Sequence, residues 1–407
     1  MNLDEESISE FLLLGYVLDN KSFQKGKKAK IKTNPPKFQK KENVTIKDVE
    51  NVLKNSILKL TKNKNKIGVM LSGGKDARLL LALAKSLKIN VTAVIVGDGE
   101  KRTEEIAAIK IAKTLKTPYK LVRIPKKVSS GIVTRINKVT EGLIQFSGIT
   151  PMFLIKDELA KDFDIVLNGN LMTEIMDTCE YRWYDSKNPV DVMIRKHFQG
   201  RLILKNEYFK IVQENFISRF KDKSLEEIIL ETEYVSRMRG INALHKLGCI
   251  EIGIPAADID VISTTFSLPI QKRTNGRLAI SILKKSYSEI AGIRSPKTPF
   301  PLSYPWWIHY GMQEIKNRYY YFKNGSKIWN GKPRAHKMGM WDQGFFFKYR
   351  IGDYVKKSLE NIDFYMIKQD PVKQILDNHF SEKKDETTYL AKLVTLKNWL
   401  DNNYQKK

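Results

Sequence analysis

The residues with the clearest chemical potential form a short loop at 71–78, Leu-Ser-Gly-Gly-Lys-Asp-Ala-Arg. An apolar stretch typical of a strand precedes this loop, and a leucine-rich stretch typical of a helix follows it. Two glycines without Cβ atoms let main-chain amides approach a ligand closely. The positive end of the following helix favours anionic oxygens at the same place, and the Ser72 hydroxyl adds a donor. The loop is therefore predicted to bind phosphate groups.

A carboxylate, Asp76, lies in the same turn. An acidic group beside phosphates is disfavoured unless a cation such as Mg²⁺ lies between them. We therefore expect ATP and Mg²⁺ as cofactors, with Asp76 as the main metal ligand. The loop lacks the glycine-lysine spacing of Walker-type proteins and the three glycines of dinucleotide-binding folds. A glycine pair after a strand can also make only a turn, but the order of strand, loop, helix and strand favours the binding loop.

The elements around this loop alternate between strand and helix. Strands are expected at 67–71, 91–96, 119–124 and 164–168, and helices at 45–60, 77–87 and 104–115, with helical spacing again from 128 to 160 and mostly from 190 to 290. This alternation predicts an α/β fold with a doubly wound, mainly parallel sheet flanked by helices.

Three parts of the chain are expected. Residues 1–44 would hold a helix and a basic connector, residues 45–305 the α/β domain, and residues 306–407 an aromatic-rich, mostly helical extension.

The composition bounds the class of protein and its partners. Seventy-one Lys and Arg residues against 45 acidic ones leave a net charge of +26, which would suit RNA or another polyanion. These residues are mostly lysines spread along the whole chain, so a compositional bias is the favoured explanation of the charge. Apolar runs are too short for a membrane span, and the acidic N-terminus differs from a secretory signal. Two cysteines cannot form a disulfide framework. A cytoplasmic protein without membrane contact is expected.

Residues 71–81 resemble the S-G-G-x-D-S loop and aliphatic helix of the PP-loop ATP pyrophosphatases, whose fold is adenine nucleotide α-hydrolase-like. The wider context, from about 45 to 305, resembles the asparagine synthetase and β-lactam synthetase family. Further segments resembling that family follow in the same order at 94–99, 248–269 and 294–300. Residues 8–26 resemble the end of the glutaminase domain that usually precedes this module.

The resemblance implies a reaction and a set of site residues. Members of the family activate a carboxylate as acyl-AMP with release of pyrophosphate, and an amine then displaces AMP to form an amide. By resemblance, the loop residues would bind pyrophosphate and Mg²⁺, Glu174 would be the second metal ligand, and two late basic residues would balance charge during transfer. The residues implied are Leu71, Ser72, Gly73, Gly74, Asp76, Val96, Gly169, Glu174, Arg277 and Lys297.

Several positions depart from the family pattern. Asn2 stands where the glutaminase cysteine would be, so the amine is expected from free ammonia, from a separate glutaminase subunit or from the substrate. Ala77 replaces the last serine of the loop. In the segment 169–174, Gly-Asn-Leu-Met-Thr-Glu, Asn170 and Thr173 stand where the family has carboxylates, which leaves Glu174 and Asp177 as candidate ligands.

Three interpretations remain open at this stage. The chain could be an amide-forming ligase acting on a small carboxylate and an amine, an enzyme that adenylates an RNA or a carrier protein, or a catalytically impaired homologue with a binding role. Cys179 lies near the second metal segment, as a sulfur-transfer residue could, but a structural role is favoured because no second cysteine is close. The sequence identifies neither the acyl substrate nor the oligomeric state.

Overall fold

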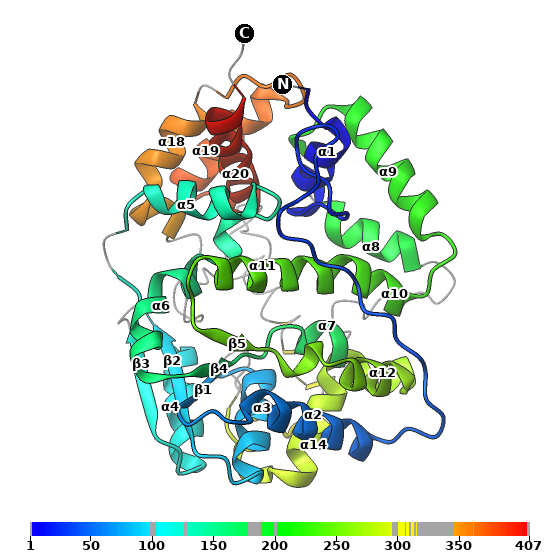
Figure 1. Ribbon diagram of the computed structural model, residues 1–407, viewed down its shortest axis with the longest axis vertical. Coiled ribbons are helices and arrows are strands. Elements are labelled where there is room, and N and C mark those ends of the chain that lie inside the picture. The colour runs from blue at the N-terminus through cyan, green and yellow to red at the C-terminus, as the bar shows by residue number, and fades with distance from the viewer. Residues whose placement is uncertain are drawn as a thin grey trace.

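The computed structural model describes residues 2–97, 103–125, 128–177, 189–198, 202–294, 300–305, 307–308, 311–312, 315, 346–360 and 362–404. A sheet with its helices forms one half of the molecule, and a group of helices forms the other (Figure 1). Helix α11 (Val235–Lys246) runs across the molecule between the two halves (Figure 1).

The sheet has five parallel strands in the order β3-β2-β1-β4-β5. These strands are β1 (Ile67–Met70), β2 (Val91–Gly97), β3 (Tyr119–Arg123), β4 (Ile165–Leu167) and β5 (Glu251–Gly253). The four predicted strands are confirmed. The edge strand β5 was not predicted, because three residues are too few to produce a readable alternation of apolar and polar side chains.

Both faces of the sheet are covered by helices. On β2, Ala93 and Ile95 belong to the large core that also contains the leucines of α3 (Lys75–Ser86). Val94 and Val96 point to the other face, into a second core that includes Leu159 of α6 (Thr150–Asp162). Successive side chains of a strand point to opposite faces, so the continuous apolar run of β2 reflects burial on both sides. The predicted doubly wound α/β fold is confirmed.

The helices predicted at 45–60, 77–87 and 104–115 are confirmed to within two residues, whereas α7 (Met172–Met176) was not predicted. The helices around the sheet are α2 (Ile46–Thr61), α3 (Lys75–Ser86), α4 (Thr103–Thr114), α6 (Thr150–Asp162), α7 (Met172–Met176), α12 (Ile259–Ser267), α13 (Ile270–Arg273), α14 (Arg277–Ser286) and α15 (Ser288–Ala291). The predicted N-cap of α2 is confirmed: the Thr45 hydroxyl accepts from the Asp48 amide, and the Asp48 carboxylate accepts from the Thr45 amide at 2.8 Å.

The second half joins segments from both ends of the chain. Its helices are α1 (Glu5–Leu14), α5 (Gly131–Thr140), α8 (Pro189–His197), α9 (Asn206–Phe220), α10 (Leu225–Ile229), α18 (Gly352–Leu359), α19 (Gln369–Phe380) and α20 (Thr387–Asn403). Helix α1 packs against α9 and α20, and α20 packs against α5 and α18. The boundaries at 44/45 and 305/306 stay a prediction. None of the described helices is both long and apolar enough to cross a membrane.

A buried lysine connects α20 to α1. The Lys392 side chain is only 3% exposed, and its ammonium donates to the Leu13 carbonyl at 2.6 Å, in the last turn of α1. Burial lowers the pKa of Lys392 to about 7, because a charge is poorly solvated in the protein interior.

This pKa gives a testable dependence of stability on pH. Between pH 7 and the usual lysine pKa, the unfolded chain binds more protons than the folded chain, so the Lys392 contribution to stability rises with pH. Relative to Lys392→Met, the wild type should gain about 1 kcal/mol of unfolding free energy per pH unit between pH 7 and 9. Urea unfolding at several pH values measures this. Lys397→Met, on the same helix but more exposed, is the control. Parallel curves for wild type and Lys392→Met would contradict the expectation.

Candidate functional site

The glycine loop lies at the carboxyl end of β1, where the sheet changes direction. Strand β2 lies beside β1 on one side, and β4 lies beside β1 on the other side. The Leu71 amide extends the ladder by donating to the Val94 carbonyl, and the Asn168 amide donates to the Gly253 carbonyl, both at 2.8 Å. Such a switch point is where open α/β sheets form their ligand crevice.

A cavity of about 300 Å³ opens at this point. Its lining comes from the two loops and consists of Met70, Leu71, Ser72, Asp76, Ala77, Asn168 and Gly169. The structure thus brings together Leu71, Ser72, Asp76 and Gly169 from the predicted site. Gly169 faces the loop directly, because a Cβ atom there would lie 3.7 Å from the Asp76 Cβ and 3.8 Å from the Ala77 amide nitrogen.

The turn leaves hydrogen-bonding groups for a ligand. The Ser72 Oγ accepts from the Gly74 amide at 3.2 Å, so the hydroxyl hydrogen can still be donated. Gly74 is the N-cap of α3 and provides no side-chain cap for the first turn of that helix. Amides of an uncapped first turn lack partners within the helix and favour an anion.

The buried side chain of Arg78 fixes the glycine loop through hydrogen bonds to its backbone. Its guanidinium is 0% exposed and donates to the Gly73 carbonyl from Nε at 3.1 Å and from Nη2 at 2.8 Å. The same group donates to the carbonyls of Ile290, Ile293 and Arg294 at 2.8–2.9 Å. Burial lowers the pKa of Arg78 to about 10. The planar fork of donors therefore ties the loop to the chain after α14.

A lysine links two carboxylates beside the cavity. The Lys75 ammonium lies 3.3 Å from Asp76 Oδ2 and 2.8 Å from Asp177 Oδ2. Asp76 Oδ2 also accepts from the Thr173 hydroxyl at 2.7 Å. Asp177 Oδ1 accepts from the Gly276 amide at 2.6 Å. Sequence reasoning missed the role of Lys75, although its place inside the glycine loop was a signal for it.

The donors suit a divalent cation that arrives with phosphates. Asp76 Oδ1 is buried and has no hydrogen-bond partner within the described structure. Mg²⁺ is commonly held by one or two carboxylates together with substrate phosphates and water, so one free carboxylate oxygen beside a phosphate loop fits. Nowhere in the described ranges do three or more His, Cys, Asp or Glu residues form a metal-binding group.

Glu174 lies on α7, and its carboxylate binds Arg237 of α11 at 3.1 Å. It is not among the residues that line the cavity, and its role as second metal ligand stays a prediction. The preceding Leu171 is left-handed, with φ 68°, and almost fully buried. Non-glycine residues in that conformation are uncommon and often lie at functional sites. Here the unusual turn begins the helix that carries Thr173 and Glu174.

The remaining predicted residues lie at different places. Val96 is buried in the second core. Arg277 is the first residue of α14 and donates to the Gln271 carbonyl at 3.0 Å; the adjacent Gly276 contacts the Lys75 side chain. Lys297 and Cys179 lie outside the described residues.

Comparison with known proteins supports one family. The family model for asparagine synthase matches residues 48–224. No curated protein matches the chain.

One similar solved structure is an NH3-dependent NAD synthetase from Campylobacter jejuni subsp. jejuni NCTC 11168 in complex with the nitrate ion. It is 18% identical to this chain, and the match covers 48% of this chain and 96% of that chain with a TM-score of 0.27. An NMN synthetase from Francisella tularensis is 13% identical over 57% of this chain and 97% of that chain, with a TM-score of 0.24. Similarity this low supports no inference about function.

The Arg78 contacts predict the effect of removing the guanidinium. Arg78→Met leaves several buried carbonyls without donors, and each such loss costs about 1–3 kcal/mol. We expect a loss of roughly 3 kcal/mol or more in unfolding free energy, measured by urea unfolding. Arg78→Lys should recover little, because one ammonium cannot reach the same set of carbonyls. Arg135→Met, on the exposed face of α5, is the control. Equal stability of the Arg78 and Arg135 variants would refute the interpretation.

Proposed function

We propose that this protein is an ATP- and Mg²⁺-dependent ligase that forms an amide, because residues 48–224 match the family model for asparagine synthase. The family match supports an ATP-using PP-loop ligase in general. The observation that carries the finer proposal is the cavity at the switch point. Its lining includes Ser72, at the turn before α3, and Asp76, one of whose carboxylate oxygens is buried and without a hydrogen-bond partner among the described residues.

The proposed reaction has two steps. An oxygen of the substrate carboxylate attacks the α-phosphorus of ATP, the bond between the α-phosphorus and the bridging oxygen breaks, and pyrophosphate leaves. The amine nitrogen then attacks the acyl carbon and loses a proton, and AMP leaves. Carboxylates are poor electrophiles, whereas acyl-AMP carries a good leaving group. Such reactions depend mainly on positioning and charge stabilisation.

The residues of the chain would divide this work. The Ser72 hydroxyl and the amides at the start of α3 would bind the departing pyrophosphate. Leu71 and Gly169 would border the adenosine, with Val96 behind them in β2. Asp76 would hold Mg²⁺, which neutralises developing charge on the phosphates when bound. Arg277 and Lys297 would contribute positive charge.

The amine donor is part of the same proposal. We propose that free ammonia or a separate glutaminase subunit supplies it. The carboxylate would be a small molecule, with aspartate as the first compound to test.

An assay of ATP cleavage tests the proposal. With ATP, Mg²⁺, ammonia and a panel of carboxylates that includes aspartate, we expect AMP and pyrophosphate. Asp76→Asn should lower the rate at least about a hundredfold, because the metal loses its carboxylate while the neighbouring bonds can persist. Asp157→Asn, whose side chain is 84% exposed on α6, is the matched control. Release of ADP and phosphate would refute the proposed cleavage, and tight ATP binding without turnover would favour an impaired homologue.

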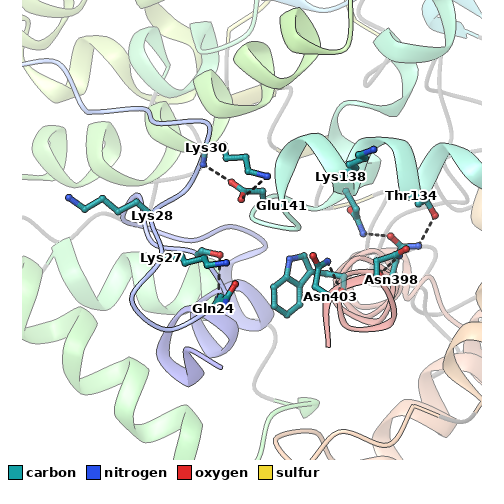
Figure 2. Close-up of a pocket in the computed structure, with 13 residues that line it drawn as sticks. Gln24, Lys27, Lys28, Lys30, Thr134, Lys138, Glu141, Asn398 and Asn403 are labelled. Carbon is teal, nitrogen blue, oxygen red and sulfur yellow. Dashed lines mark hydrogen bonds and ion pairs between the residues drawn. The ribbon is translucent and has the colours of Figure 1, made fainter. Parts of the chain in front are cut away.

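A second candidate function rests on a different cavity. About 640 Å³ of space lies among the N-terminal segment, α5 and α20. Figure 2 shows Lys27, Lys28 and Lys30 on one side of this space and Lys138 of α5 on another. Lys30 lies 3.8 Å from the Glu141 carboxylate. The other three lysines have no carboxylate partner among the described residues.

Uncompensated lysines around one concave surface repel one another and attract a polyanion. This observation favours the interpretation in which the adenylated acceptor is an RNA. The phosphate backbone would bind at the lysine cavity while the acceptor group reaches the glycine loop. Binding of this kind weakens as salt rises, because it releases condensed counterions.

Electrophoretic mobility of transfer RNA across salt concentrations tests this candidate. The triple variant Lys27, Lys28 and Lys138→Gln should bind at least about tenfold more weakly and reduce the slope of log affinity against log salt by about 2–3. The control removes equal charge elsewhere, through Lys62, Lys110 and Lys113→Gln, all exposed. Equal weakening by both variants would indicate general attraction to a basic protein, and absence of any salt-sensitive shift would reject RNA.

A further inference from the structure

The ammonium group of Lys75 lies between the Asp76 and Asp177 carboxylates, where a bridging metal ion would otherwise balance two negative charges. Its distances to the nearest oxygens are 3.3 Å for Asp76 and 2.8 Å for Asp177. The Lys75 and Asp76 side chains are each 19% exposed and the Asp177 side chain 1% exposed. Lys75 is therefore the cation that neutralises Asp177 in this structure.

Both oxygens of Asp177 contact the protein itself, one through a hydrogen bond and the other through an ion pair without hydrogen-bond geometry. One accepts from the Gly276 amide at 2.6 Å, and the other faces the Lys75 ammonium. Gly276 is left-handed, with φ 74°, and a Cβ atom there would lie 3.0 Å from the Cδ and Cε of Lys75. Because Gly276 has no side chain, the backbone before α14 can lie close to the aliphatic part of Lys75. A metal ion could reach Asp177 only if Lys75 withdrew.

Asp76 differs from Asp177 in that its side chain is partly exposed and lines the cavity. Its Oδ2 is taken by Thr173 and Lys75, but its Oδ1 is buried and unpartnered, and the residue lines the cavity. The third neighbour of the carboxylates is the hydroxyl of Thr173, which adds no charge. Two carboxylates and one ammonium leave a net charge of −1.

We propose that Lys75 takes the place of a divalent cation between Asp76 and Asp177, so that this site binds a single divalent cation through Asp76, and Asp177 is not a ligand. This inference rests on the proposed function in one point: the divalent cation at Asp76 is the one that accompanies ATP. It gives Lys75 and Asp177 a positioning role: the ammonium holds Asp76 Oδ2 in place, and Gly276 and Asp177 hold the ammonium.

Binding of Mn²⁺ in the absence of nucleotide tests the proposal. The electron paramagnetic resonance signal of free Mn²⁺, followed during a titration, gives the affinity. Lys75→Met should bind Mn²⁺ at least about tenfold more tightly than the wild type, because the two carboxylates lose their built-in cation. Lys75→Met with Asp177→Asn should lose that gain. Lys75→Arg, which keeps the charge, should bind Mn²⁺ as the wild type does. Addition of Mg²⁺ should raise the Tm of Lys75→Met more than that of the wild type.

Asp177→Asn alone gives an answer even if Lys75→Met fails to fold. We expect its affinity for Mn²⁺ to stay within about threefold of the wild type, whereas loss of a true ligand would weaken binding tenfold or more. The proposal is overturned by such a loss, by an unchanged affinity in Lys75→Met, or by a gain that persists in the double variant. Because no ATP is present, these results are independent of the cleavage assay, and a protein that releases no pyrophosphate could still show the expected pattern.

Discussion

The arrangement of the site depends on one buried guanidinium. Arg78 projects from the first turns of α3, back under the loop that precedes it, and binds the Gly73 carbonyl together with the chain after α14. A glycine pair gives a loop conformational freedom, and this freedom must be removed before amides can be held at fixed positions. A single residue with a planar fork of donors removes it. Replacement of that fork would release both the loop and the segment that follows α15.

The same loop also carries the charge balance of the site. Lys75 and Asp76 are adjacent in sequence, so the loop contributes both an ammonium and a carboxylate to one small volume. Thr173 and Asp177 approach from the segment after β4, and Gly276 from the start of α14. Three segments far apart in sequence therefore meet around Lys75. Their contacts explain how a chain that lacks two of the carboxylates expected at 170 and 173 can still present a neutralised, ordered site.

The helical half places a second charged surface on the same molecule. Residues near both ends of the chain pack there, since α1 lies against α20. The cavity of Figure 2 lies at this junction. Its lysines come from the N-terminal segment and α5, and three of its asparagines come from α20. Nothing in the composition distinguishes these lysines from the many others. Within the part of the chain that the structure describes, Lys27, Lys28 and Lys138 have no carboxylate partner, and this is a property of the packing.

The sequence by itself determined the loop, the alternation of strands and helices, and a resemblance to one family, because these depend on local periodicity and on a short run of adjacent residues. Leu71, Ser72 and Asp76 are neighbours in the chain, and so their shared cavity could be predicted. Only the tertiary structure decided that Lys75 pairs with Asp177, that Glu174 pairs with Arg237, and that Arg78 is buried among carbonyls. Those pairings join residues about 60 to more than 200 positions apart, and local pattern carries no information on which distant charges meet once the core has closed.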